Sequence, residues 1–161
     1  MPQAPATRID KPVALRAARL LRGFTDVGVK ILAEVASQRS LGKGSYAFKA
    51  GEASATLTFV VKGTLQLQAD GGAALGEVVS GDSVGGLALL VEGEHVVSAQ
   101  AASDVELLEV TRAAFDEMKR THPRTALKLT LALAQDLADR LREAKGPLRE
   151  FLTWEAGKRQ G

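Results

Sequence analysis

The stretch SGDSVGGLALLVEGEHVVSA, residues 80–99, decides how the rest of the chain is interpreted. Two adjacent glycines, Gly85 and Gly86, open a short apolar segment, a pattern typical of a turn whose backbone N–H groups face an anion. The stretch contains no lysine or arginine, and none occurs between Lys62 and Arg112. The sequence therefore predicts a loop shaped for a phosphate but lacking the cation that would bind it strongly.

Length and composition indicate one globular domain. The chain has 161 residues, 45% of them hydrophobic, and no cysteine, which excludes disulfides and thiolate metal sites. No stretch approaches the roughly 18 apolar residues that a membrane span needs, and residues 1–12 lack the apolar region of a signal peptide. We therefore expect a cytoplasmic protein with no membrane association.

Charge is divided unevenly along the chain. Residues 1–22 hold five Lys or Arg against one acid, and residues 140–161 hold six against three. Residues 23–139 hold ten basic side chains against fifteen acidic ones. An acidic centre does not attract a polyanion, so we expect no direct DNA binding there.

The centre of the chain reads as short strands. Residues 56–61 and 64–69 alternate apolar and polar side chains around Lys62–Gly63, which predicts one hairpin. Residues 95–101 and 105–110 are predicted as the last strand pair. Turn signals recur roughly every ten residues, the rhythm of a sandwich, jelly roll or barrel.

Helices are expected on both sides of the strands. Periodicity predicts one helix over residues 11–22 and a second over residues 26–40. Thr111 can cap a helix over residues 112–122, and a longer helix follows over about residues 124–145. The order of elements is therefore helical, then β, then helical.

The long helix carries two neighbouring apolar stripes. Leu129, Leu133 and Leu137 form one stripe, which could pack on the strands. The other stripe could pack on a partner helix and make a homodimer, or both could be buried within one monomer. The members of this dimer or partner face are Leu127, Leu131, Ala134, Ala138 and Leu141.

An enzyme is the least supported class of protein. The two histidines, His95 and His122, form no clustered metal signature, so no metal or catalytic residue is expected. The GKGS stretch at residues 42–45 lacks the spacing of a Walker A phosphate-binding loop, which needs four residues between its first glycine and Gly-Lys. Ser45 and Ser98 have no neighbouring His and acid in a recognisable arrangement.

Four motifs in order resemble the cyclic nucleotide-binding domain family. They are GSYAFKAGE (44–52), FVVKGTLQL (59–67), SGDSVGGLALL (80–90) and LLEVTRAAFDEMKRTHP (107–123). The resemblance implies a mainly β fold of the jelly-roll type, an eight-stranded β-roll with N-terminal helices and a long C-terminal helix. It divides the chain into a partly helical extension (1–17), the nucleotide-binding-like domain (18–145) and a tail or short docking helix (146–161).

The resemblance also implies a phosphate-binding cassette, from which this chain departs at two positions. Gly86 stands where the family has a glutamate for the ribose hydroxyl, and His95 stands where it has the arginine for the phosphate. Val96 and Val97 replace small residues. The positions that match the family pattern are Gly85, Leu87, Ala88 and Ser98.

These departures predict weakened binding of any cyclic nucleotide. A bidentate arginine contact to phosphate is about twice as strong as a neutral hydrogen bond. His95, with an ordinary pKa of about 6.5, is mostly neutral in the cytoplasm. Glu92 and Glu94 beside it repel a phosphate.

The sequence is compatible with three functions. The first is a regulatory module that acts through protein–protein interaction, with an impaired nucleotide site. The second is a cAMP- or cGMP-responsive domain that switches a partner through its C-terminal helix. The third is a transcription regulator, but about sixteen residues follow the long helix, too few for a helix-turn-helix, so DNA binding would need another chain.

Overall fold

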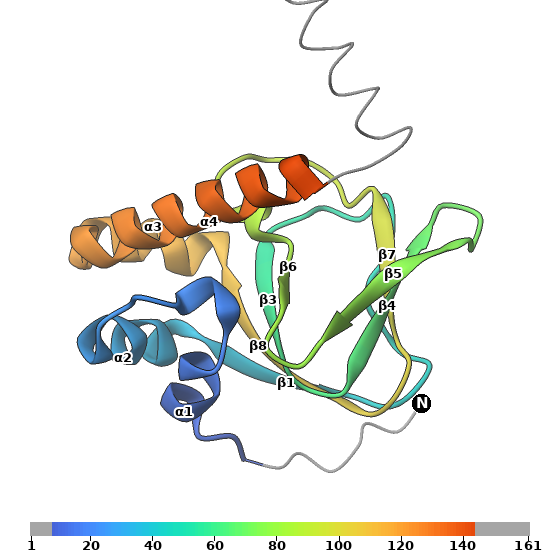
Figure 1. Cartoon of the computed structure of the whole chain (residues 1–161), viewed down its shortest axis with the longest axis horizontal. Helices are drawn as coiled ribbons and strands as arrows, with labels where there is room; N and C mark the ends of the chain where they lie inside the picture. Colours follow the sequence, from blue (N-terminus) through green and yellow to red (C-terminus); the bar gives the residue numbers. More distant parts are fainter. Residues whose placement is uncertain (1–7, 144–161) are drawn as a thin grey trace, which may run out of the picture.

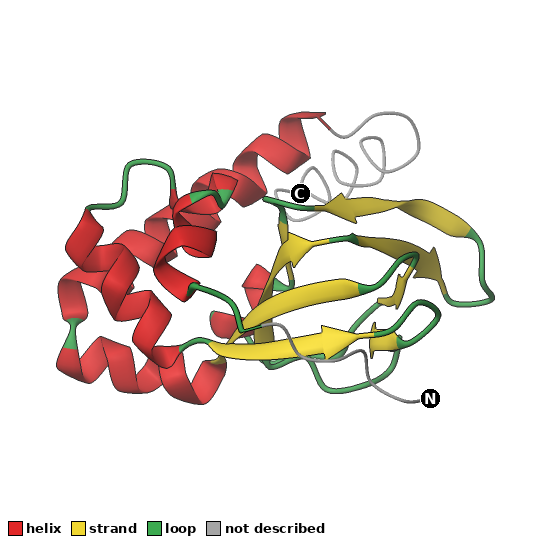
Figure 2. Ribbon diagram, turned by 90° about the horizontal axis from the view of Figure 1, so that it is seen from below, coloured by secondary structure: helices red, strands yellow, loops and turns green. Residues whose placement is uncertain are grey.

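The structure, a computed structural model, describes residues 8–143. Helices gather on one side of the molecule and two sheets lie on the other (Figures 1 and 2). The helical elements are α1 (Lys11–Arg16), η1 (Arg19–Leu21), α2 (Asp26–Val35), η2 (Gly86–Leu89), α3 (Arg112–Thr121) and α4 (Pro123–Glu143). The strands are β1 (Ser37–Leu41), β2 (Tyr46–Phe48), β3 (Thr56–Lys62), β4 (Thr64–Ala69), β5 (Ala74–Val79), β6 (Ser83–Val84), β7 (Val97–Ala101) and β8 (Val105–Thr111).

The N-terminal helices are shorter than their periodicity predicts. The side chain of Asp10 accepts a hydrogen bond from the backbone of Val13 and so starts α1, but that helix ends at Arg16 and only the turn η1 follows. The second prediction, over residues 26–40, is wrong beyond Val35. Every residue of β1 pairs with β8 instead, and these ladder hydrogen bonds override a helical pattern.

The strands form two antiparallel sheets of four, in the orders β1-β8-β3-β6 and β2-β7-β4-β5. This arrangement confirms the predicted mainly β roll with flanking helices. The predicted hairpin between residues 56–61 and 64–69 is wrong, because β3 and β4 belong to different sheets and β4 pairs with β5. The predicted pairing of residues 95–101 with 105–110 is also wrong, because β7 and β8 are likewise in different sheets.

Gly63 explains the failed hairpin. It has a left-handed backbone (φ +87°), and a Cβ placed on it would lie 2.3 Å from the carbonyl oxygen of Asp104. The backbone is therefore pressed against the β7–β8 connection as it passes from one sheet to the other. A very short connection can therefore join strands of two different sheets and does not by itself indicate a hairpin.

Two apolar clusters hold the fold together. One lies between the sheets, where Leu65, Val105 and Leu107 are buried. The other joins the helices to the outer face of the first sheet, where Leu57 pairs with Val110 and Phe59 with Leu108. The helical members of this second cluster include Leu15, Leu21, Leu32, Phe115, Leu129 and Leu133. Residues of the 1–17 extension thus share the core of the domain.

The C-terminal helices follow their predicted positions. Thr111 accepts a hydrogen bond from the Ala114 amide (3.1 Å) and starts α3, and α4 begins at Pro123. On α4, Leu129 and Leu133 of one stripe are buried and Leu137 is 37% exposed, whereas Leu127 and Leu131 of the other stripe are 60% and 61% exposed. Burial of both stripes in the monomer is therefore wrong. The expected docking helix in residues 146–161 lies outside the described residues.

Candidate functional site

The first half of the cassette contains the turn that its glycines predict. Gly85 adopts a left-handed backbone (φ +82°), and a Cβ there would lie 2.5 Å from the carbonyl oxygen of Thr56 in β3. The chain then enters η2, in which the Ala88 amide donates to the carbonyl of Gly85 (3.0 Å). Only glycine fits position 85, since any side chain would meet backbone.

Helix α4 occupies the space beside the second glycine. A Cβ on Gly86 would lie 2.5 Å from Cδ2 of Leu133 and 3.8 Å from Cδ1 of Leu57. Leu133 is only 4% exposed and belongs to the core cluster beneath the helices. Any side chain at position 86 would therefore meet a core leucine of α4.

A cavity of about 170 Å³ lies between the cassette and α4. Gly85, Gly86 and Leu87 line it from the cassette, and Leu133, Leu137 and Arg140 line it from the helix. The guanidinium of Arg140 donates to the carbonyl of Ser83 (3.0 Å) and pairs with Asp136 (2.9 Å). A cation is thus present at the cassette, but it comes from a helix more than fifty residues further along the chain.

The second half of the cassette is held by other contacts. The ring of His95 stacks on Phe48 with centroids 3.8 Å apart and planes 7° apart. Its backbone pairs with the loop before β3, donating to Glu52 and accepting from Gly51, both at 2.8 Å. Burial lowers the pKa of His95 below its usual value, opposed in part by the nearby carboxylate of Glu52. The imidazole is therefore neutral at neutral pH.

The remaining predicted site residues face different surroundings. Ser98 accepts a hydrogen bond from the Ala50 amide (3.0 Å), and Val97 begins β7. Val96 is 83% exposed, and Ala88 is buried. None of these four, nor His95, lines the cavity beside Gly86. The structure thus brings Gly85, Gly86 and Leu87 together with α4 around this cavity.

Arg112 is a further residue at the cassette that the sequence analysis missed. Its Nε donates to the carbonyl of Ala88 (2.6 Å), and its Nη2 donates to Ser54 (2.7 Å) and Val91 (3.1 Å). One side chain at the start of α3 therefore binds the end of η2 and two loops. Its place directly after the helix cap Thr111 was the only available signal.

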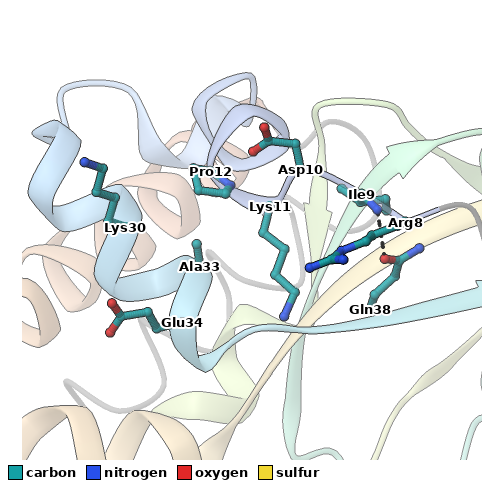
Figure 3. Close-up of a pocket in the computed structure, with 9 residues that line it drawn as sticks. All are labelled: Arg8, Ile9, Asp10, Lys11, Pro12, Lys30, Ala33, Glu34 and Gln38. Carbon is teal, nitrogen blue, oxygen red and sulfur yellow. Dashed lines mark hydrogen bonds between the residues drawn. The ribbon is translucent and has the colours of Figure 1, made fainter.

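A larger cavity lies elsewhere, between the N-terminal segment and α2 (Figure 3). It measures about 900 Å³, and the amide of Ile9 donates across it to Gln38 (3.1 Å). Lys11 also crosses it, donating to the carbonyl of Ala36 (2.6 Å). None of the predicted site residues lines this cavity.

Two further properties concern the described residues as a whole. Within residues 8–143, no group of three or more His, Cys, Asp or Glu side chains could hold a metal ion. Over the same range, no helix is both long and apolar enough to cross a bilayer.

The chain is similar to several known proteins. Lysophospholipase nte1 of Aspergillus fumigatus is 25% identical over 146 residues, which are 86% of this chain and only 10% of that protein. The catabolite activator protein of Thermus thermophilus is 30% identical with a TM-score of 0.68, covering 77% of this chain and 58% of that one. The regulatory subunit of a cAMP-independent protein kinase A from Trypanosoma brucei is 19% identical with a TM-score of 0.67. The match covers 89% of this chain and 47% of that one.

The family itself follows from the central part of the chain. Residues 38–122, just over half of the 161, match the cyclic nucleotide-binding domain. This range contains all eight cassette residues and most of both sheets. A family of regulatory, non-enzymatic domains is thus identified by sequence and fold together, and the chain belongs to the cyclic nucleotide-binding domain family.

Proposed function

We propose that this chain is a non-enzymatic regulatory module with an impaired nucleotide site, which acts through protein–protein contacts. The observation that carries the proposal is the contact between Gly86 and Leu133. The position that offers the family's ribose acceptor has no side chain here, and a core leucine fills the space. A nucleotide would have to displace part of α4 to reach the cassette.

Electrostatics supports the same conclusion. A buried phosphate without a paired cation bears a desolvation cost of several kcal/mol. His95 is neutral and stacked on Phe48, and Arg140 is already paired with Asp136. The backbone turn at Gly85 remains, but neutral donors alone bind an anion about half as strongly as charged ones.

The protein contact that we propose uses the exposed stripe of α4. Leu127, Leu131 and Leu141 are exposed on one side of a helix whose other side is buried. Together with Ala134 and Ala138 they follow a heptad spacing, which suits a second α4 in a homodimer. We propose that the regulatory unit comprises residues 18–145, works in the cytoplasm, and needs another chain for any contact with DNA.

A cAMP- or cGMP-responsive sensor is the second candidate. It is favoured by the retained turn at Gly85 and by Arg140, whose guanidinium lies on the same cavity. In that case the nucleotide would recruit Arg140 from Asp136, and α4 would pass the change to a partner.

Calorimetric titration with cAMP and cGMP separates the two candidates. We expect no saturable heat up to about 1 mM ligand, at neutral pH or near pH 5.5. Saturable micromolar binding by the natural sequence would contradict impaired binding and favour the sensor.

A restored site is the matched test. The variant Gly86→Glu/Leu133→Ala/His95→Arg supplies both missing groups and removes the leucine that blocks one of them. We expect it to bind, whereas Leu133→Ala alone should not, since it opens space without supplying either group. For the homodimer, sedimentation velocity at high salt, where contacts between exposed charges are screened, should show a mass that rises with concentration, and Leu127→Ser/Leu131→Ser should abolish that rise.

A further inference from the structure

A second surface, away from the cassette and the α4 stripe, has the features of a docking groove. It measures about 630 Å³ and lies between α2 and the turn that joins α3 to α4. Phe24, Ile31 and Pro123 line it, and Val27 is exposed at its edge. The groove therefore offers an apolar floor to an apolar side chain.

The charges of this groove are all of one sign. Arg124 and Lys128 line it, and no Asp or Glu does. Lys128 lies over the ring of Phe24 (5.3 Å) and donates to the carbonyl of Gly23. Arg124 has no hydrogen bond or ion pair with any other residue between 8 and 143. An occupant with carboxylates beside an apolar anchor would complement this groove.

The chain itself carries a surface of this kind at residues 91–96, here called the knob. Val91 and Val96 are exposed, and Val96 is the more exposed of the two. Glu92 and Glu94 are also exposed, and neither carboxylate pairs with another side chain within the described part of the chain. The knob therefore combines apolar anchors with unpaired negative charge.

Hydrogen bonds to Arg112 and to the loop between β2 and β3 hold the backbone of the knob. Arg112 holds the carbonyl of Val91, the Ser54 amide donates to Gly93 (2.9 Å), and His95 pairs with Gly51 and Glu52. Its side chains are thus presented without the entropy cost of ordering a mobile loop on binding.

We propose that the groove of one copy binds the knob of a second copy. In Figure 1, α2 and the start of α4 lie at the left, whereas the segment between β6 and β7 runs over the top of the roll toward the right. Groove and knob are therefore on different parts of one molecule, and the contact is head-to-tail. Each added copy leaves one groove and one knob free, so assembly proceeds beyond a dimer unless a ring closes.

The chain's own C-terminal segment fits the groove less well. Residues 144–161 hold four Lys or Arg against two Glu, so their net charge repels Arg124 and Lys128. The head-to-tail contact extends the proposed function, because it names one protein contact that the chain would make. It does not depend on whether the cassette binds a nucleotide. It also differs from the α4 homodimer, which is symmetric and closes at two copies.

Charge reversal tests the contact. Sedimentation velocity of the full chain at low salt should show association that weakens as salt is raised. The groove variant Arg124→Glu/Lys128→Glu and the knob variant Glu92→Lys/Glu94→Lys should each weaken this association about tenfold or more. An equimolar mixture of the two variants should recover it, because carboxylates again face cations at each contact.

Controls make the result specific. Lys43→Glu/Lys62→Glu changes the net charge as much as the groove variant does, at exposed lysines outside the groove, and should leave association unchanged. Val96→Ser removes the apolar anchor at constant charge and should weaken association, with circular dichroism confirming that every variant is folded. A natural sequence that stays monomeric, or variants whose mixture fails to recover association, would overturn the proposal. If Leu127→Ser/Leu131→Ser abolishes association and the groove and knob variants do not, the proposal is also overturned, and the α4 homodimer explains the association.

Discussion

Substitution of Gly86 by alanine tests the contact that closes the cassette. The new Cβ would lie 2.5 Å from Cδ2 of Leu133, well inside van der Waals contact. Overpacking a core costs about 1–3 kcal/mol. Leu133 also lines the 170 Å³ cavity, so its methyl group can shift, and Gly-to-Ala itself stabilises by about 0.4–1 kcal/mol where the backbone permits it. We therefore expect Gly86→Ala to lower the free energy of unfolding by about 1 kcal/mol.

A double-mutant cycle measured by urea denaturation isolates the contact. Leu133→Ala alone should cost about 2–5 kcal/mol, because it leaves a cavity in the core. In that background Gly86→Ala should be neutral or stabilising, which gives a coupling energy of about 1 kcal/mol or more. Gly93→Ala is the matched control, since nothing lies within 4 Å of a Cβ there. Additive effects at positions 86 and 133 would refute the reasoning.

Three further predictions use the same denaturation assay. Gly63→Ala should cost more than about 2 kcal/mol, because a left-handed backbone and the fixed carbonyl of Asp104 both oppose a side chain; a cost near zero would contradict the close approach. Thr111→Ala should cost about 1 kcal/mol through loss of the helix cap, and an unchanged midpoint would show that the cap is unimportant. Burial lowers the pKa of His95, so the unfolded state binds the proton more readily than the folded state does. The contribution of neutral His95 to the free energy of unfolding is therefore complete above about pH 6.5. It is lost as the pH falls from there through the pKa of the folded state. His95→Asn should lack this component of the pH dependence, and an identical pH profile in the variant would count against it.

The central strands and the C-terminal helices were predictable from the sequence, whereas the ends of the N-terminal helices and the pairing of the strands were not. The alternation in residues 56–61 and 64–69 correctly indicates strands, and Thr111 correctly marks the start of a helix. Alternation shows which face of a strand is buried but not which strand lies beside it. The residues Lys62–Gly63 between the two runs therefore suggested a hairpin turn, whereas in the structure β3 extends to Lys62 and Gly63 carries the chain between sheets.

The site was predictable only as far as it is local. Gly85 and the turn that follows are encoded in adjacent residues, and the structure contains that turn. Leu133 and Arg140 reach the cassette from α4, about fifty residues away in the sequence. Helical periodicity predicts which face of α4 packs inward, but not which segment of the chain that face contacts. The contacts of Arg112 were not predictable either, because its partners are backbone carbonyls, which every residue has.

The order of strands also bears on how the chain folds during synthesis. Of the six strand pairings in the described residues, only that of β4 with β5 joins consecutive strands. Strand β1 must wait for β8, about seventy residues later, before it gains a hydrogen-bonded neighbour. Such long-range pairing slows folding and leaves unpaired edges exposed while the ribosome is still adding residues. The β4–β5 hairpin is thus the piece that can form first, and completion of the roll awaits the last strand.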